Sequence, residues 1–383
     1  MTFVLSPEYE ELRSAIRRFC DDGIAPHAAG ADASAEFPRE SFQAYRDSGF
    51  VRLPYPEEFG GDGGDGIAYA ILVEEVARAC GSSSLFVLIS RLATEAVLAH
   101  GSEELKARIM PKVASGEWQG SYCLSESHAG SDVASMRTHA VRDGDEYVIN
   151  GSKCWITNAG VSDFYTVFVK TDPEAGHRGI SALVVEHDRP GFSVSKLESK
   201  MGMKGSPTGE ISFDDVRVPV ENLIGEENKA FAYAMGALDG SRPVVGAQAV
   251  GIAQGALDAA VRYVTQRQQF GQSVSEFQGV QFMLADMATR VEAARLLVYS
   301  AVARAEAGLP GASKAAAMAK FFAGDTAMSV TTDAVQLHGG AGYTTDFPVE
   351  RMMRDAKVTQ IYEGTNQIQR VVVARRLLDE FTG

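Results

Sequence analysis

The chain has 383 residues, of which 45% are apolar and 22% are charged, and its formal net charge is −14. This composition indicates a soluble globular protein with more than one domain and excludes a disordered or fibrous chain. The acidic charge argues against sequence-independent binding of nucleic acid, which needs a basic face to displace counterions.

The N-terminus, cysteines and histidines narrow the class of protein further. The first 20 residues lack a basic start followed by an apolar run, and no uninterrupted apolar stretch approaches the ~18 residues of a membrane span. We therefore expect a cytoplasmic protein without a membrane anchor. The four cysteines lack C-x-x-C spacing and the seven histidines form no H-E-x-x-H pattern, so we expect buried thiols and no metal site.

Hydrophobic periodicity divides the chain into three blocks and predicts an α+β fold. Residues 1–118 favour an N-terminal α-helical domain, with Ser6 and Pro7 suited to a helix start. Residues 119–230 carry short alternating or β-branched runs between glycine-containing turns, which predict a central antiparallel β domain of the sandwich or barrel type. Residues 231–383 predict a C-terminal four-helix-bundle domain, with helical periodicity near 243–268, 278–307, 313–337 and 365–381.

One stretch, GGDGGDG at 60–66, matches the dinucleotide-binding pattern G-x-G-x-x-G. That fingerprint needs a buried strand before it, whereas the preceding LPYPEEF contains two prolines and two acids. Asp62 and Asp65 would also repel a pyrophosphate. We interpret the stretch as a loop that enters a helix.

Six short motifs occur in an order that resembles the acyl-CoA dehydrogenase family. They are YCLSESHAGSD at 122–132, KCWITN at 153–158, LDGSRP at 238–243, RQQFGQ at 267–272, QLHGGAGY at 336–343 and IYEGTNQIQR at 361–370. The order of helical, β and helical blocks agrees with this family over essentially the whole length. The resemblance implies an FAD enzyme that oxidises the Cα–Cβ bond of an acyl-CoA thioester to a trans-2-enoyl thioester.

A single carboxylate, Glu363, lies between bulky residues and a glycine within QIYEGTNQIQR. Removal of a proton beside a thioester needs a base, and burial raises the pKa of a carboxyl group toward a useful range. The local sequence equally allows an acid at the start of a helix near Thr365. The resemblance assigns Glu363 as the catalytic base, with Tyr362 and Gly364 beside the substrate and the Glu363 amide as a donor to the thioester oxygen.

The β hydride needs a redox cofactor, because no amino-acid side chain accepts a hydride. The family positions around the flavin ring and pyrophosphate correspond here to Tyr122, Leu124, Ser125, Gly130, Ser131, Trp155 and Thr157. Taken singly, a tryptophan in a strand is typical of a core and AGSD is typical of a turn. The joint pattern favours an FAD site.

In the family, the adenine half of FAD is held partly by a neighbouring subunit. The matching positions of that partner chain are Arg267, Phe270, Gln278, Gln336, Gly339 and Gly340. Thr365 and Gln367 match contacts from the subunit that carries the base. Arg267 would pair with the pyrophosphate, although alone it is typical of a solvated charge at a helix end. The resemblance therefore implies a homotetramer, a dimer of dimers, that is needed for activity.

The substrate positions are carried over in the same way. Asp239, Arg242 and Ser131 match contacts to CoA, although Asp239 and Arg242 also fit an ordinary helical ion pair. The acyl tail in the family inserts beside the helix that reads SSSLFVLISRLATEAVLAHG, and the candidate pocket residues there are Leu85, Leu88, Ile89 and Leu92. Their bulk favours a short or branched acyl group, but core packing explains the same residues equally well.

Some residues depart from the family pattern. Ser127 stands where many relatives have proline, and 226–231 lacks the glycines common before the CoA-side helix, which leaves the acyl carrier open. No glutamate lies near Asp239 and Arg242, where some relatives place the base, and this absence favours Glu363.

Three alternative functions remain open at this stage. They are a dehydrogenase of acyl or aminoacyl groups on a carrier protein, a flavin oxidase, and a non-catalytic helical partner protein. If the chain is an acyl-CoA dehydrogenase, we expect an electron-transferring flavoprotein as its electron acceptor.

Overall fold

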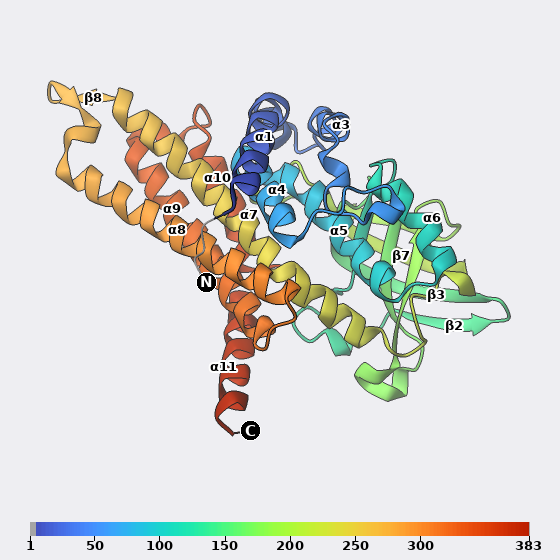
Figure 1. Cartoon of the computed structure of the whole chain (residues 1–383). Coiled ribbons are helices and arrows are strands. Elements are labelled where there is room, and N and C mark those ends of the chain that lie inside the picture. The colour runs from blue at the N-terminus through green and yellow to red at the C-terminus, as the bar shows by residue number, and fades with distance from the viewer. Residues whose placement is uncertain (1–4, 383) are drawn as a thin grey trace.

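The computed structural model describes residues 5–382 of the chain. The N-terminal block is formed by helices, the middle block by a curled sheet, and the C-terminal block by long helices (Figure 1). This arrangement confirms the predicted α+β class. Ser6 occupies the N-cap position of the first helix, but its side chain makes no capping hydrogen bond. The N-terminal helices are α1 (Pro7–Gly23), α2 (Ala28–Ser34), α3 (Arg39–Asp47), α4 (Gly66–Ala79), α5 (Gly81–His100) and α6 (Glu103–Ala114).

The glycine-rich stretch at 60–66 is a loop that leads into α4, as predicted. Asp65 is the N-cap of α4, and its side chain accepts a hydrogen bond from the backbone N–H of Ala68. The acid thus caps a helix, as short polar residues at helix starts commonly do.

A seven-stranded sheet forms the middle of the chain. Most neighbouring strands are antiparallel as predicted, including β2–β3, β3–β7 and β4–β5. The first strand runs parallel to β4 instead, because two other strands separate them in sequence and no hairpin constrains their direction. The strands are β1 (Gly120–Cys123), β2 (His139–Asp143), β3 (Glu146–Thr157), β4 (Phe164–Lys170), β5 (Ile180–Glu186), β6 (Phe192–Leu197) and β7 (Thr208–Pro219).

The C-terminal block contains the four predicted long helices. Helix α9 packs against α7, α8 and α11, and α7 also packs against α8. The short helix α10 and a small β8–β9 hairpin were not predicted from periodicity. The elements are α7 (Ala230–Gln266), β8 (Gln268–Gln269), β9 (Gln272–Ser273), α8 (Gln278–Glu306), α9 (Ala312–His338), α10 (Val349–Ala356) and α11 (Asn366–Thr382).

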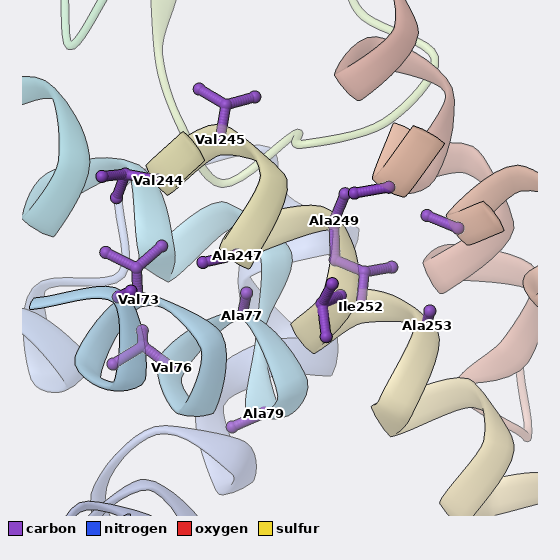
Figure 2. Close-up of a cluster of buried hydrophobic side chains, with 14 of the residues drawn as sticks. Val73, Val76, Ala77, Ala79, Val244, Val245, Ala247, Ala249, Ile252 and Ala253 are labelled. Atoms are coloured by element: carbon purple, nitrogen blue, oxygen red, sulfur yellow. The ribbon is translucent and has the colours of Figure 1, made fainter. Parts of the chain in front are cut away.

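The long helix α7 connects the blocks. It runs from the β8–β9 hairpin across the molecule to the side of the sheet, and α4 packs along it (Figure 1). Valine and alanine side chains of α4 and α7 fill the contact (Figure 2). The two backbones lie very close, since a Cβ on Gly251 would come within 2.1 Å of the Glu74 carbonyl oxygen. Glycine is therefore required at this crossing.

The apolar helices belong to the core. On length and composition α5 and α7 could cross a membrane, but 78% of the apolar window in each is buried inside the fold, as in the core helices of soluble proteins. The cysteines Cys20, Cys80, Cys123 and Cys154 are buried free thiols, as predicted.

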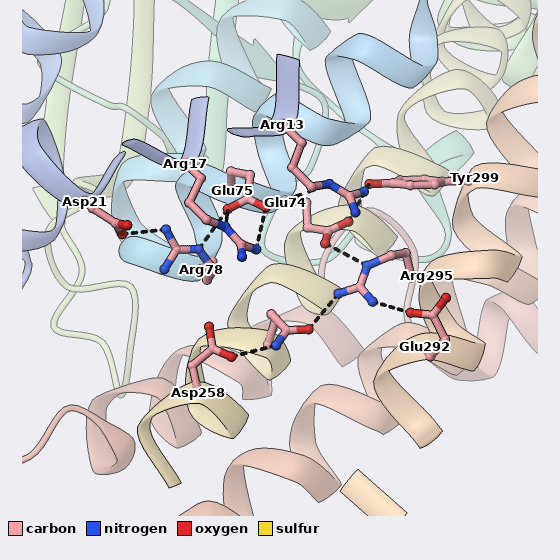
Figure 3. A network of polar contacts seen from close by, with 11 residues as sticks. Arg13, Arg17, Asp21, Glu74, Glu75, Arg78, Asp258, Glu292, Arg295 and Tyr299 are labelled. Atoms are coloured by element: carbon pink, nitrogen blue, oxygen red, sulfur yellow. Dashed lines mark hydrogen bonds and ion pairs between the residues drawn. The ribbon is translucent and has the colours of Figure 1, made fainter. Parts of the chain in front are cut away.

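A buried network of charged side chains joins α1, α4, α7 and α8 (Figure 3). Glu74 accepts hydrogen bonds from Arg295 Nε at 2.9 Å and from the Tyr299 hydroxyl at 2.7 Å, and its side chain is only 2% exposed. Glu75 accepts both Nε and Nη2 of Arg17 at 2.9 Å. Each buried acid thus faces a cation from another helix, which stabilises a single helix arrangement.

We expect Glu74→Ala to lower the free energy of unfolding by about 3–5 kcal/mol, because it leaves the Arg295 guanidinium buried beside an empty position. The measurement is denaturant unfolding of the purified protein. Glu292→Ala is the matched control, since Glu292 also binds Arg295 but its side chain is 58% exposed. Equal losses in the two variants would contradict the importance of the buried pair.

Candidate active site

Glu363 lies in the turn between the 3₁₀ turn Lys357–Gln360 and α11. Its backbone φ is +50° and that of Gly364 is +89°, so two successive residues are in the left-handed region. A Cβ at position 364 would come within 2.4 Å of Gln369 Nε2, which explains the glycine. A left-handed glutamate is uncommon and is maintained only when the surrounding structure holds it.

The helix cap is a different residue. The Thr365 hydroxyl accepts the backbone N–H of Ile368 at 3.2 Å, as an N-cap residue of α11 does. The interpretation of Glu363 as the acid that caps this helix is therefore not supported, and its carboxylate is available for another role.

The Glu363 carboxylate faces α7. The Ser241 hydroxyl donates to Oε2, whereas Oε1 is buried and has no hydrogen-bond partner within residues 5–382. Burial raises the pKa of Glu363, while the Ser241 hydrogen bond and the positive charges of Lys320 and Arg242 act in the opposite direction. The site thus holds a carboxyl group of increased basicity with one free oxygen atom.

Tyrosine rings lie around this carboxylate. Burial and then the negative charge of Glu363 raise the pKa values of Tyr122 and Tyr362 well above the ordinary value. The Tyr362 hydroxyl donates to Gln248 Oε1, and Gln248 Nε2 donates to Ser84 Oγ at 2.7 Å. A chain of polar contacts therefore connects the turn of the base to α7 and to the first turn of α5.

The predicted substrate residues lie on α7, on α5, in this turn and in the loop that follows β1. Asp239 and Arg242 form the expected ion pair on α7, but Arg242 is buried, unlike a pair on a solvated helix face. Gly364 is half-buried beside the base and Ser131 is exposed. The four predicted pocket residues of α5 all belong to the main buried core: Leu85, Leu88, Ile89 and Leu92.

The residues predicted to contact the flavin ring lie at the end of β1 and on β3. Trp155 has φ +58° at an irregularity of the β3–β7 pairing, and its side chain is 55% exposed. It is therefore not a core tryptophan. Leu124 is buried, the Ser125 carbonyl accepts the Cys154 N–H at 3.0 Å, and the Thr157 carbonyl accepts the Ser121 hydroxyl at 2.7 Å.

These residues fit a planar cofactor. The ring of Trp155 is presented to the outside of the sheet, where it can cover one face of an aromatic group. A Cβ on Gly130 would meet no atom of the chain within 4 Å, so the space in front of this backbone is open to a ligand. Ser131 follows it and is also exposed.

A second group of predicted cofactor residues lies at the other end of the bundle (Figure 1). Phe270 in the β8–β9 hairpin is 92% exposed with φ +54°. The remaining members are exposed residues at the end of α7, the start of α8 and the end of α9, namely Arg267, Gln278, Gln336, Gly339 and Gly340. The 37 residues of α7 span about 55 Å between this group and the end of the helix beside the sheet, and Trp155 lies on β3 of that sheet. Thr365 and Gln367 lie beside the base.

Sequence reasoning missed three residues that hold the base. Ser241 lies within the quoted motif LDGSRP, and its hydroxyl could have been noticed two residues after Asp239. Gln369 Nε2 donates to the carbonyls of Glu363 and Gly364, both at 3.2 Å. Lys320 on α9 is fully buried, and the signal for it was a lone lysine in the apolar stretch AAAMAKFFAG.

Comparisons with known proteins identify the family of this chain. Three family models match the chain: "Acyl-CoA dehydrogenase, N-terminal domain" at residues 6–117, the corresponding middle domain at 121–216, and the C-terminal domain at 228–378. The chain is 57% identical over 376 residues to the probable acyl-CoA dehydrogenase FadE25 of Mycobacterium tuberculosis, covering 98% of this chain and 97% of that protein.

Solved structures show the same fold. The butyryl-CoA dehydrogenase of Megasphaera elsdenii superposes with a TM-score of 0.95 at 40% identity, covering 99% and 100% of the two chains. A chain in a structure of the electron transferring flavoprotein of Acidaminococcus fermentans has a TM-score of 0.96 at 45% identity, with coverage of 99% and 100%. The prolyl acyl carrier protein oxidase AnaB has a TM-score of 0.93 at 30% identity, with coverage of 98% and 100%.

The raised pKa of Glu363 predicts how stability depends on pH. The folded state holds the Glu363 proton more tightly than the unfolded state, so this contribution is present below the ordinary carboxyl pKa and is lost as pH rises through the folded pKa. We expect the difference in melting temperature, Glu363→Gln minus the unmodified chain, to increase between pH 4 and neutral pH. Thermal denaturation across pH measures this. Exposed Glu58→Gln is the control, and a difference between Glu363→Gln and the unmodified chain that is independent of pH would contradict the burial argument.

Proposed function

Because the chain belongs to the acyl-CoA dehydrogenase family, whose members oxidise a CH–CH bond of an acyl-CoA, we propose that it converts a short or branched acyl-CoA to the trans-2-enoyl-CoA. Glu363 is the base that removes the α proton. One observation carries this role: a buried carboxylate with one oxygen hydrogen-bonded by Ser241 and the other without a partner in residues 5–382.

The proton would pass from the α carbon to Oε1 of Glu363. The Ser241 hydroxyl fixes Oε2 and so orients the carboxylate toward the substrate. No backbone carbonyl within residues 5–382 accepts from the Glu363 amide, so this N–H is free to donate to the thioester oxygen as negative charge develops there. The partly buried rings of Tyr122 and Tyr362 shield the carboxylate from water and help to maintain its raised pKa.

The family implies a flavin, for which we propose FAD, and this group would supply the acceptor for the β hydride. Trp155, Thr157, Leu124, Ser125 and Tyr122 would lie along the ring, with Gly130 and Ser131 beside the pyrophosphate. Thr365 and Gln367 would contact the cofactor at the start of α11, where backbone N–H groups favour an anion. Asp239, Arg242 and Ser131 would contact CoA.

A partner subunit would complete the cofactor site. The exposed group of Phe270, Arg267, Gln278, Gln336, Gly339 and Gly340 lies at the hairpin end of α7, about 55 Å from the end of this helix beside the sheet. We propose that it serves a neighbouring chain in a homotetramer. An electron-transferring flavoprotein is the proposed electron acceptor, supported by the similarity to a chain in the A. fermentans structure.

The short acyl group is supported by the packing around the base. Gln248 and Ser84 are fully buried and bonded to each other between α7 and α5, next to Tyr362. Leu88 is buried on the same face of α5 as Ser84, one helical turn further on. Buried side chains at these positions would limit the length of the acyl tail, and the M. elsdenii relative is a butyryl-CoA dehydrogenase.

A second candidate is oxidation of an acyl or aminoacyl group on a carrier protein, favoured by the similarity to AnaB. The test is anaerobic titration of the yellow protein with the same acyl groups on CoA and on a phosphopantetheinyl carrier protein. Flavin bleaching by CoA thioesters supports the main proposal. Bleaching by carrier-bound groups alone would replace it with the second.

Glu363→Gln should lower the rate of flavin bleaching by about 10²–10⁴-fold, the usual contribution of a general base. Stopped-flow absorbance under anaerobic conditions measures the rate, and Glu58→Gln should react like the unmodified enzyme. Full bleaching at an unchanged rate in Glu363→Gln would remove this residue from the mechanism.

Leu88→Ala should shift the preference of the enzyme toward longer acyl groups, because it removes a buried side chain from the proposed pocket. The ratio of kcat/KM for a medium-chain and a short-chain acyl-CoA measures this. Leu105→Ala on α6 is the matched control, since both leucines are 1% exposed and each loss costs about 2–5 kcal/mol of stability. Equal changes in this kcat/KM ratio in Leu88→Ala and Leu105→Ala would contradict the placement of Leu88 in the acyl pocket.

A further inference from the structure

Lys320 lies in the middle of α9, and its side chain is fully buried. Its Nζ donates to the Gly364 carbonyl at 2.8 Å and to Asn366 Oδ1 at 3.1 Å. Both acceptors belong to the turn that carries Glu363. Burying an ammonium group costs free energy unless other groups compensate its charge. Lys320 therefore needs compensating groups near this turn.

Neighbouring contacts hold the same turn to α9. Asn366 Nδ2 donates to the Phe321 carbonyl at 3.1 Å and to Asp325 Oδ1 at 2.9 Å. The helix and the turn lie close, since a Cβ on Gly324 would come within 3.4 Å of Asn366 Nδ2. Lys320 and Asn366 therefore position the left-handed pair of residues 363 and 364 from one side.

The charges around Lys320 indicate which acid compensates it. Within residues 5–382 no carboxylate lies within 4.0 Å of its Nζ, whereas Arg242 on α7 has Asp239 and Arg370 on α11 has Asp325. Of the charges that act on Lys320, the largest opposing burial is the negative charge of Glu363; Arg242 repels it and Asp325 attracts it less. Burial lowers the pKa of Lys320 to about 8. The two buried charges thus depend on each other.

We propose that Lys320 is a positioning residue for the base: it holds the backbone of the turn from α9 and supplies the buried positive charge that keeps Glu363 ionised and able to accept a proton. This inference rests on the proposed function in assigning Glu363 as the base. Lys320 acts on Glu363 through its charge and through its hydrogen bond to the Gly364 carbonyl. Its role is therefore to position the base and not to bind the substrate.

The test uses two substitutions of different character. Lys320→Met removes both the hydrogen bonds and the charge, and Lys320→Gln retains a donor while removing the charge. We expect the acidic limb of the pH–rate profile for anaerobic bleaching by butyryl-CoA to move to higher pH in both variants. The rate below that limb falls about tenfold for each pKa unit of the shift.

The matched control is Lys170→Met. Lys170 on β4 is also a buried lysine, and its Nζ donates to the Gly176 carbonyl at 3.0 Å, but Glu363 is not among its partners. This variant should lose stability and keep the acidic limb unchanged. An acidic limb in Lys320→Met and Lys320→Gln that coincides with that of the unmodified enzyme would overturn the proposal.

A measurement without substrate separates this proposal from the proposed function. In a double-mutant cycle at neutral pH, Lys320→Met should lower the melting temperature more in the chain with Glu363 than in the Glu363→Gln chain, because only the former loses a compensating charge. Equal losses would refute the coupling. If no acyl thioester bleaches the enzyme but the cycle shows coupling, the proposed function fails while the Lys320–Glu363 interaction stands.

Discussion

The burial of the Glu363 carboxylate is the constraint on which the rest of the site depends. A carboxylate in water is a weak base, and burial alone would favour its neutral form. Ser241 from α7 and the positive charges of Lys320 and Arg242 offset part of that cost. The site therefore combines raised basicity with groups that stabilise the ionised form, and both require that α7, α9 and the turn before α11 meet at one point.

The helical framework makes this meeting point rigid. α4 packs against α7 so closely that Gly251 admits no side chain, and the buried Glu74 and Glu75 bind arginines from other helices. α7 then holds Ser241 and Arg242 beside the base, and Gln248 beside Tyr362, at fixed positions along one helix. A misplacement of this helix would separate the base from its partners, because each contact is a single hydrogen bond or a short-range charge.

The two exposed aromatic groups suggest how the molecule is completed. Trp155 at the sheet and Phe270 at the hairpin are both left-handed, exposed residues in otherwise well-packed regions. Large exposed rings held in unusual backbone conformations are typical of surfaces that contact a ligand or partner. Their separation along α7 agrees with the proposed sharing of one cofactor between two chains.

The sequence by itself determined the classes of element and the motifs. Helical periodicity predicted the long C-terminal helices and alternation predicted most of the strands, because these signals are local. Glu363 was assigned by the family resemblance that the motifs carry, since the local sequence equally allowed an acid at a helix start. The sequence did not predict the parallel β1–β4 pair, because pairing between strands that are distant in sequence leaves no local pattern. It also did not predict α10 or the β8–β9 hairpin, because these elements are too short to show a periodic pattern.

Only the tertiary structure decided which residues surround the base. Thr365 caps α11, so Glu363 is free of that role, and Ser241 and Lys320 reach it from positions 122 and 43 residues away in sequence. Local patterns cannot show such contacts, because hydrogen bonding, burial and the resulting pKa depend on distances that exist only after distant helices have packed together.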